Sequence, residues 1–199
     1  LLLTLSPLNI NPISNNYDLF LSNNQIEYAK KFRAKFSQKF LIGINLSGAV
    51  KGKKIKFSLL NQLCTSLFSY DNNIQILILT TPTEHQYVNQ KLKKMRLDFV
   101  SIAYKTETIL DVSALISELD LVITPDTSIV HIASAFDIAV VSIHERNYDS
   151  YNLFAPTSTF NRTVFSESKD SLKGFSLDLL LEYSFELIDL IKNEKTETI

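Results

Sequence analysis

Short apolar runs recur along the chain between longer segments that mix apolar and polar residues. Each run has the length of a strand and is apolar at nearly every position, which is typical of strands buried on both faces of a parallel sheet. Strands are therefore predicted at residues 40–46, 74–79, 99–103, 121–124, 138–143 and 163–166.

The intervening segments place apolar residues at helical spacing, which predicts helices. These cover residues 23–36, 55–70, 111–118, 128–136 and 177–192, and a further polar helix follows the Thr81–Pro82 turn and ends near Met95. Residues 144–162, rich in Asn, Tyr, Asp and Ser, are predicted to form a long loop. The alternation of strand and helix indicates an α/β fold, a Rossmann-like doubly wound parallel sheet of about six strands.

The two ends of the chain are predicted to lie outside this domain. Residues 1–21 lack a helical pattern and begin with Leu1 rather than Met, so we expect a linker or extended segment that leaves another domain. Residues 22–193 are expected to form the Rossmann-like domain, and residues 194–199 a polar tail.

Composition excludes several classes of protein. Lys and Arg number 20 and Asp and Glu 21, a net charge of -1, whereas a nucleic-acid binder needs a basic excess. Cys64 is the only cysteine, which excludes an intrachain disulfide and a Cys-based zinc cage and favours a reducing, cytoplasmic compartment. No apolar run is long enough to span a bilayer.

The residues that follow the strands are candidates for ligand binding, because open α/β sheets bind ligands at the carboxyl ends of their strands. The segment Pro125-Asp126-Thr127-Ser128-Ile129-Val130-His131 follows a strand and begins a helix. Unpaired N–H groups and the positive end of the helix dipole make such a start an anion site. Asp126 or Thr127 can cap the helix, the Thr127 and Ser128 hydroxyls can donate to phosphate, and His131 lies one turn further on. The same residues are also an ordinary helix start, and His131 also fits a core position.

A second candidate is the basic loop after the first strand. Ser47 and Gly48 are small enough for a ligand to approach the backbone, and the lysines from Lys51 to Lys54 supply positive charge. The four glycines form neither a Walker A loop nor a G-x-G-x-x-G motif. A solvated basic turn is the alternative interpretation.

The third candidate follows the second strand. Glu84 and Gln86 lie where Rossmann-type sites place an acidic residue that takes ribose hydroxyls. Glu84 is equally compatible with a first-turn helix charge. The long loop after His144 can fold over a ligand or a neighbouring domain.

Residues 120–143, DLVITPDTSIVHIASAFDIAVVSI, resemble the donor-binding signature of glycosyltransferase family 9, the bacterial lipopolysaccharide heptosyltransferases. That signature is an aspartate, two or three apolar residues and P-D-T-G-x-x-H-x-A-x-A. INLSGAVKGKKI resembles the family's first phosphate-binding loop, and Phe154-Ala155-Pro156 the aromatic-x-Pro that ends a later loop.

The resemblance implies one half of a GT-B fold, the carboxyl-terminal domain that binds a nucleotide-sugar. It places the donor near Asp126, Thr127, Ser128, His131, Ser47, Gly48, Lys53, Glu84 and Gln86, and no catalytic residue in this chain. The expected reaction is an inverting transfer of heptose from ADP-heptose to the lipopolysaccharide core, with neither metal nor cofactor. The expected partners are an amino-terminal acceptor-binding domain that supplies the base, the donor and the acceptor. The expected location is the cytoplasm, peripheral to the inner membrane.

One departure from the family pattern and two other function classes stay open. Ser128 replaces the usual glycine and adds a side chain where the backbone approaches the ligand. The alternatives are a non-catalytic nucleotide-binding or interaction module, and another GT-B nucleotide-sugar enzyme such as an epimerase. A flavodoxin-like electron carrier is disfavoured, since its phosphate loop after the first strand should hold several Ser or Thr residues.

Overall fold

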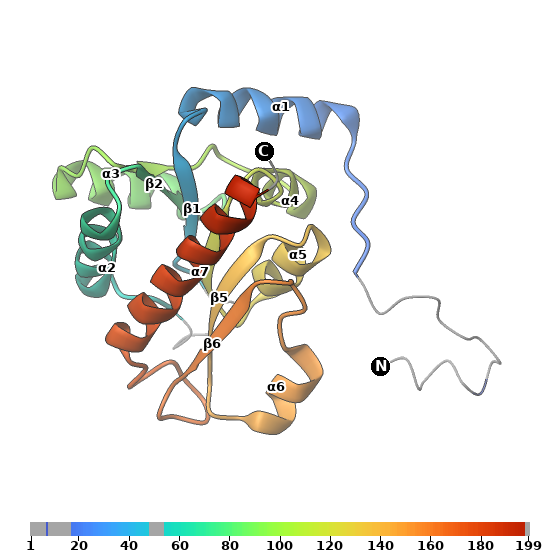
Figure 1. Cartoon of the computed structure of the whole chain (residues 1–199), viewed down its shortest axis with the longest axis vertical. Helices are drawn as coiled ribbons and strands as arrows, with labels where there is room; N and C mark the ends of the chain where they lie inside the picture. Colours follow the sequence, from blue (N-terminus) through green and yellow to red (C-terminus); the bar gives the residue numbers. More distant parts are fainter. Residues whose placement is uncertain (1–6, 8–16, 48–53, 198–199) are drawn as a thin grey trace.

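A single six-stranded parallel sheet runs through the molecule (Figure 1). The structure is a computed structural model that describes Pro7, residues 17–47 and residues 54–197. The strand order is β3-β2-β1-β4-β5-β6. The strands are β1 (Phe40–Asn45), β2 (Ile74–Leu79), β3 (Val100–Ile102), β4 (Leu121–Pro125), β5 (Ala139–His144) and β6 (Asn161–Phe165).

Helices precede the first strand, connect consecutive strands and close the chain. They are α1 (Asn23–Arg33) with the short 3₁₀ turn η2 (Ala34–Phe36), α2 (Phe57–Tyr70), α3 (His85–Met95), α4 (Ile109–Ile116), α5 (Ser128–Ala135), α6 (Tyr148–Phe154) and α7 (Leu177–Glu197). The predicted Rossmann-like sheet is confirmed. None of the described helices is long and apolar enough to cross a membrane.

Two predictions at the level of single elements are wrong. The segment 144–162 is not one long loop, because it contains α6, whose start is capped by the Asn147 side chain accepting from Ser150 N. The polar tail predicted from residue 194 is helical as far as Glu197, where α7 ends. Here Lys195 donates to Asp120, a contact that a sequence pattern cannot show.

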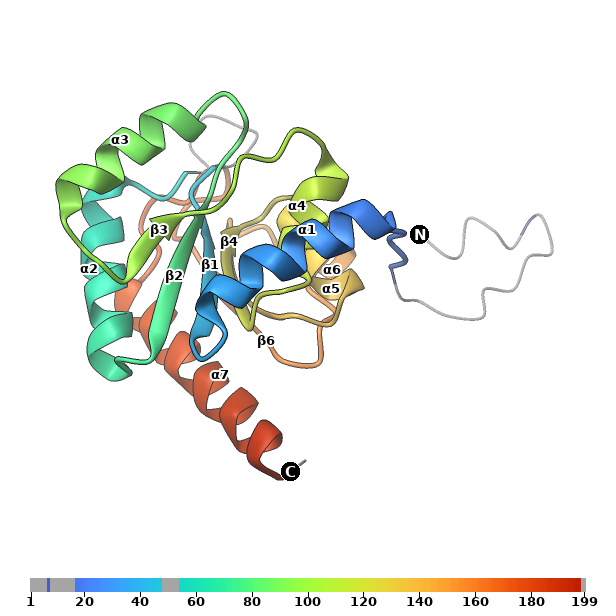
Figure 2. The same ribbon diagram turned by 90° about the horizontal axis from the view of Figure 1, so that it is seen from above.

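The sheet is covered on both faces, which is why its strands are apolar throughout (Figure 2). Successive strand residues point to opposite faces. Ile42 and Ile44 of β1 join a core with α2, α3 and α7, whereas Leu41 joins a second core with α4 and α5. Phe32 of α1 packs against this second core.

One carboxylate joins three elements at the edge of the sheet where the strands begin. Asp120 accepts a hydrogen bond from Leu41 N (2.7 Å) and ion-pairs with Arg33 (3.2 Å) and Lys195 (2.5 Å). The ends of α1 and α7 are thereby held at the start of β1 and β4. The opposite edge, where the strands end, is left to loops.

The strand order also fixes where a ligand site is expected. From β1 the chain progresses through β2 and β3 to one side, and from β4 through β5 and β6 to the other. The crevice beyond the carboxyl ends of β1 and β4 is therefore the topological switch point, the usual ligand position in such sheets.

Candidate functional site

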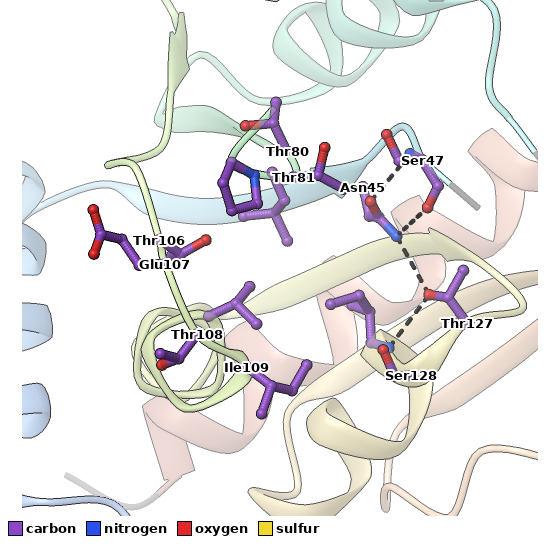
Figure 3. Close-up of a pocket in the computed structure, with 14 residues that line it drawn as sticks. Asn45, Ser47, Thr80, Thr81, Thr106, Glu107, Thr108, Ile109, Thr127 and Ser128 are labelled. Carbon is purple, nitrogen blue, oxygen red and sulfur yellow. Dashed lines mark hydrogen bonds between the residues drawn. The ribbon is translucent and has the colours of Figure 1, made fainter. Parts of the chain in front are cut away.

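A cavity of about 490 Å³ opens at this switch point (Figure 3). Its walls come from four separate segments that the sheet brings together. They are the end of β1 with Asn45 and Ser47, residues 79–82 at the end of β2 and just after it, residues 106–109 with Val112 at the start of α4, and residues 127–129 at the start of α5.

Asn45 connects the two sides of the switch point. Its Nδ2 donates to Thr124 Oγ1 (3.0 Å) and to Thr127 Oγ1 (3.3 Å), and it also donates to the Ser47 carbonyl (3.0 Å). Its Oδ1 accepts from Ser47 N (3.1 Å). Asn45 is buried, so these bonds supply partners that water does not. One amide therefore fixes the β1 side of the cavity to the start of α5.

The start of α5 lines the cavity. Thr127 is the N-cap and accepts a hydrogen bond from Ile129 N (3.3 Å). Ser128, the first helical residue, is exposed and lines the cavity. The first N–H groups of a helix carry partial positive charge and favour a phosphate in front of them.

Glu84 lies beside the cavity in a cluster of donors. Its Oε1 accepts from Lys54 Nζ (2.7 Å), and its Oε2 accepts from Ser47 Oγ (2.5 Å) and Thr81 Oγ1 (3.2 Å). The hydrogen bond from Lys54, followed by that from Ser47, lowers the pKa of the Glu84 carboxyl. Glu84 is thus an ionised group held by Lys54 and by two residues of the cavity wall, Ser47 and Thr81.

Two residues of the predicted anion segment lie away from the cavity. The Asp126 carboxylate lies 3.9 Å from His144 Nδ1. The His131 ring contacts Tyr17 (5.2 Å between ring centroids) and Phe154 (6.1 Å), and neither Asp126 nor His131 is among the described residues that line the cavity. The predicted role of each toward a donor stays a prediction.

The remaining candidates divide into exposed and undescribed residues. Gln86 lies exposed in the first turn of α3 and is not among the described lining residues. Gly48 and Lys53 lie outside the described residues. No group of three or more His, Cys, Asp or Glu side chains within the described ranges is arranged to hold a metal ion.

Sequence reasoning missed two parts of the cavity. Asn45 was not recognised as a site residue because it lies at the end of an apolar run. A polar residue at the end of a buried strand nevertheless indicates a candidate ligand contact. Residues 106–109 were overlooked because the end of the third strand was not considered. The capping pair Thr108 and Asp111, in which Thr108 Oγ1 accepts from Asp111 N (3.2 Å), could have revealed that a helix begins there.

The sequence of the chain also matches a known protein family. The profile of Glycosyltransferase family 9 (heptosyltransferase) matches residues 60–172, more than half of the chain. The chain belongs to glycosyltransferase family 9. The resemblance seen in residues 120–143 is thereby confirmed.

Solved structures of family 9 proteins share the fold of this chain. The glycosyl transferase family 9 protein of Veillonella parvula DSM 2008 superimposes with a TM-score of 0.75 at 15% identity, over 92% of this chain and 57% of its own. E. coli ADP-heptose LPS heptosyltransferase II gives 0.68 at 16% identity, over 94% and 56%. E. coli heptosyltransferase WaaC with ADP gives 0.66 at 13% identity, over 92% and 53%.

The present chain accordingly spans little more than half the length of these family 9 structures. At such low identity the likeness concerns the fold alone. No curated protein matches the chain significantly in sequence.

Proposed function

We propose that this family 9 chain is the donor-binding part of a glycosyltransferase that moves heptose from ADP-heptose to the lipopolysaccharide core. The observation that carries the proposal is the cavity at the switch point between β1 and β4. There the start of α5 faces Ser47, and residues 106–109 close the far side. A nucleotide-sugar needs an anion site beside a pocket for a nucleoside, and the cavity offers both.

The diphosphate lies in front of Thr127 and Ser128, where the helix dipole and the Ser128 hydroxyl stabilise its charge. Ser47 meets it from the β1 side, and the resemblance to family 9 adds Lys53 to the residues that bind the phosphates. Glu84 takes ribose hydroxyls, and Ile109 with Val112 offers an apolar wall to the base. The same interactions stabilise the leaving diphosphate during direct displacement of the sugar, because negative charge grows on it as the bond breaks.

The other half of the reaction belongs to a second domain. We propose that an amino-terminal domain binds the acceptor and supplies the carboxylate that deprotonates it, giving inversion without a metal or cofactor. The support is that family 9 structures are longer than this chain, which covers 53–57% of them. The acceptor would hold the enzyme at the cytoplasmic face of the inner membrane.

Isothermal titration of the 199-residue chain with ADP-heptose and with ADP tests the donor site. We expect saturable binding of both ligands. Ser128→Asp should weaken both by about tenfold or more, because a carboxylate repels the diphosphate while remaining favourable for the start of a helix.

The matched control is Ser69→Asp, which adds the same charge at an exposed position near the end of α2, at the opposite edge of the sheet. It should leave binding unchanged. A chain that is folded by circular dichroism but gives no heat with either ligand would contradict the proposal. Equal effects of the two variants would place the anion elsewhere.

A further inference from the structure

Lys54 donates a hydrogen bond to one oxygen of the Glu84 carboxylate, the group to which the proposed function assigns the ribose. Its Nζ lies 2.7 Å from Glu84 Oε1, while Ser47 and Thr81 fill Oε2. Ser47 and Thr81 line the cavity. A ribose hydroxyl that approaches Glu84 Oε1 competes with this ammonium group for the oxygen.

Glu84 is placed for this contact and not for capping its own helix. It is the N-cap residue of α3, yet its side chain makes no capping hydrogen bond there. The carboxylate is turned toward the segment after β1, where Ser47 and Lys54 lie. Glu84 therefore gives α3 no capping hydrogen bond, although a carboxylate at this position still interacts favourably with the helix dipole.

The Lys54–Glu84 pair is weak enough to exchange. The two side chains are 52% and 32% exposed. Ion pairs at such exposed positions are typically worth no more than about 1 kcal/mol. A diphosphate carries more negative charge than one carboxylate, and a lysine side chain has four flexible bonds with which to follow it.

The diphosphate position lies within the same network. Ser47 bonds to Glu84 through its hydroxyl and to Asn45 through its backbone, and Asn45 bonds to Thr127 at the start of α5. Among the described residues, hydrogen bonds through Glu84, Ser47 and Asn45 thus connect Lys54 to the helix start.

We propose that Lys54 pairs with Glu84 when no diphosphate is bound and moves to the diphosphate when one binds, which frees Glu84 for the ribose. This inference rests on the proposed donor site and adds to it a prediction of which ligands the site prefers. Ligands that carry both a diphosphate and a ribose diol are favoured over those that carry the diol alone, because only the former displace Lys54.

The exchange predicts opposite effects of one substitution on two ligands. In Lys54→Met, adenosine should bind about threefold more tightly, because Glu84 no longer has a competing cation. ADP should bind about tenfold more weakly, because it loses a charge-assisted contact. A residue that only supports the local structure would change both affinities in the same direction.

Isothermal titration of the full chain with ADP and adenosine measures both effects. Lys56→Met, which removes the same charge at an exposed position two residues away, is the control and should leave adenosine binding unchanged. In a Glu84→Gln background, Lys54→Met should no longer strengthen adenosine binding. Circular dichroism establishes that each variant is folded.

The outcomes separate this proposal from the proposed function. If ADP binds the wild type but Lys54→Met weakens both ligands or changes neither, the exchange is overturned and the donor site stands. If ADP binds neither the wild type nor the variant, both are overturned. Opposite changes that persist in the Glu84→Gln background would also overturn the exchange, since Glu84 would not be the partner.

Discussion

Asn45 Nδ2 lies 3.3 Å from Thr127 Oγ1, although the two residues are 82 positions apart in the sequence. The same nitrogen lies 3.0 Å from Thr124 Oγ1. One buried amide thus spans the two sides of the switch point, joining the end of β1 to both the end of β4 and the first residue before α5.

Asn45→Ala should lower the free energy of unfolding by about 1–3 kcal/mol, because Thr124 and Thr127 lose a buried donor. It should also weaken ADP binding, since the start of α5 loses its connection to the Ser47 side. Urea denaturation and titration measure the two effects. Asn61→Ala, at an exposed position of α2, is the control and should have little effect on either. Equal losses in the two variants would contradict the role assigned to Asn45 in joining β1 to the start of α5.

Gly43→Ala should destabilise the fold through one contact. A Cβ at Gly43 would overlap Leu119 Cδ1, and Leu119 is buried. Overpacking of this kind costs about 1–3 kcal/mol. In the double variant Gly43→Ala/Leu119→Ala, the added methyl occupies space that the shortened side chain leaves. Its loss of unfolding free energy should therefore be smaller than the sum of the two single losses; strict additivity would show that the two sites do not interact.

Acid should weaken the contribution of Glu84 to stability. Its pKa in the folded chain lies below the ordinary value of 4.5, chiefly because Lys54 donates to it. The contribution is therefore fully present above pH 4.5 and is lost as the pH falls through the folded pKa. Lys54→Met should flatten this part of the curve of unfolding free energy against pH, whereas Lys56→Met should not. Parallel acid limbs in wild type and Lys54→Met would argue against the ion pair.

Cys64 should be unreactive in the folded chain. The side chain is buried in α2, and burial raises the pKa of its thiol to about 12. Thiolate is the reactive form, so both its scarcity and its inaccessibility suppress reaction. A colorimetric disulfide reagent should label the thiol only after denaturant is added, at a midpoint that matches loss of helical circular dichroism. Fast labelling of the native chain would contradict the core position.

The strands could be predicted closely because burial on both faces leaves an unambiguous pattern. The β2 run Ile74–Leu79 was predicted with its observed bounds, and β1 and β4 differ by one residue at one end. The helix α6 was missed because it has only seven residues and none of them is buried, so its apolar pattern is too short to recognise. The last turn of α7 was missed because its anchor, Asp120, lies far away in the sequence.

The sequence by itself determined the alternation of strand and helix, the family signature around Thr127 and the polar residues that follow the strands. These are local patterns, which neighbouring residues carry. Only the tertiary structure decided that Asn45 connects the end of β1 to Thr127, that residues 106–109 close the cavity and that Lys54 forms an ion pair with Glu84. Only the tertiary structure shows that the His131 ring contacts Tyr17 and Phe154. Such relationships depend on which chain segments the sheet order makes neighbours, and a strand's pattern of burial is nearly the same whichever strand lies beside it.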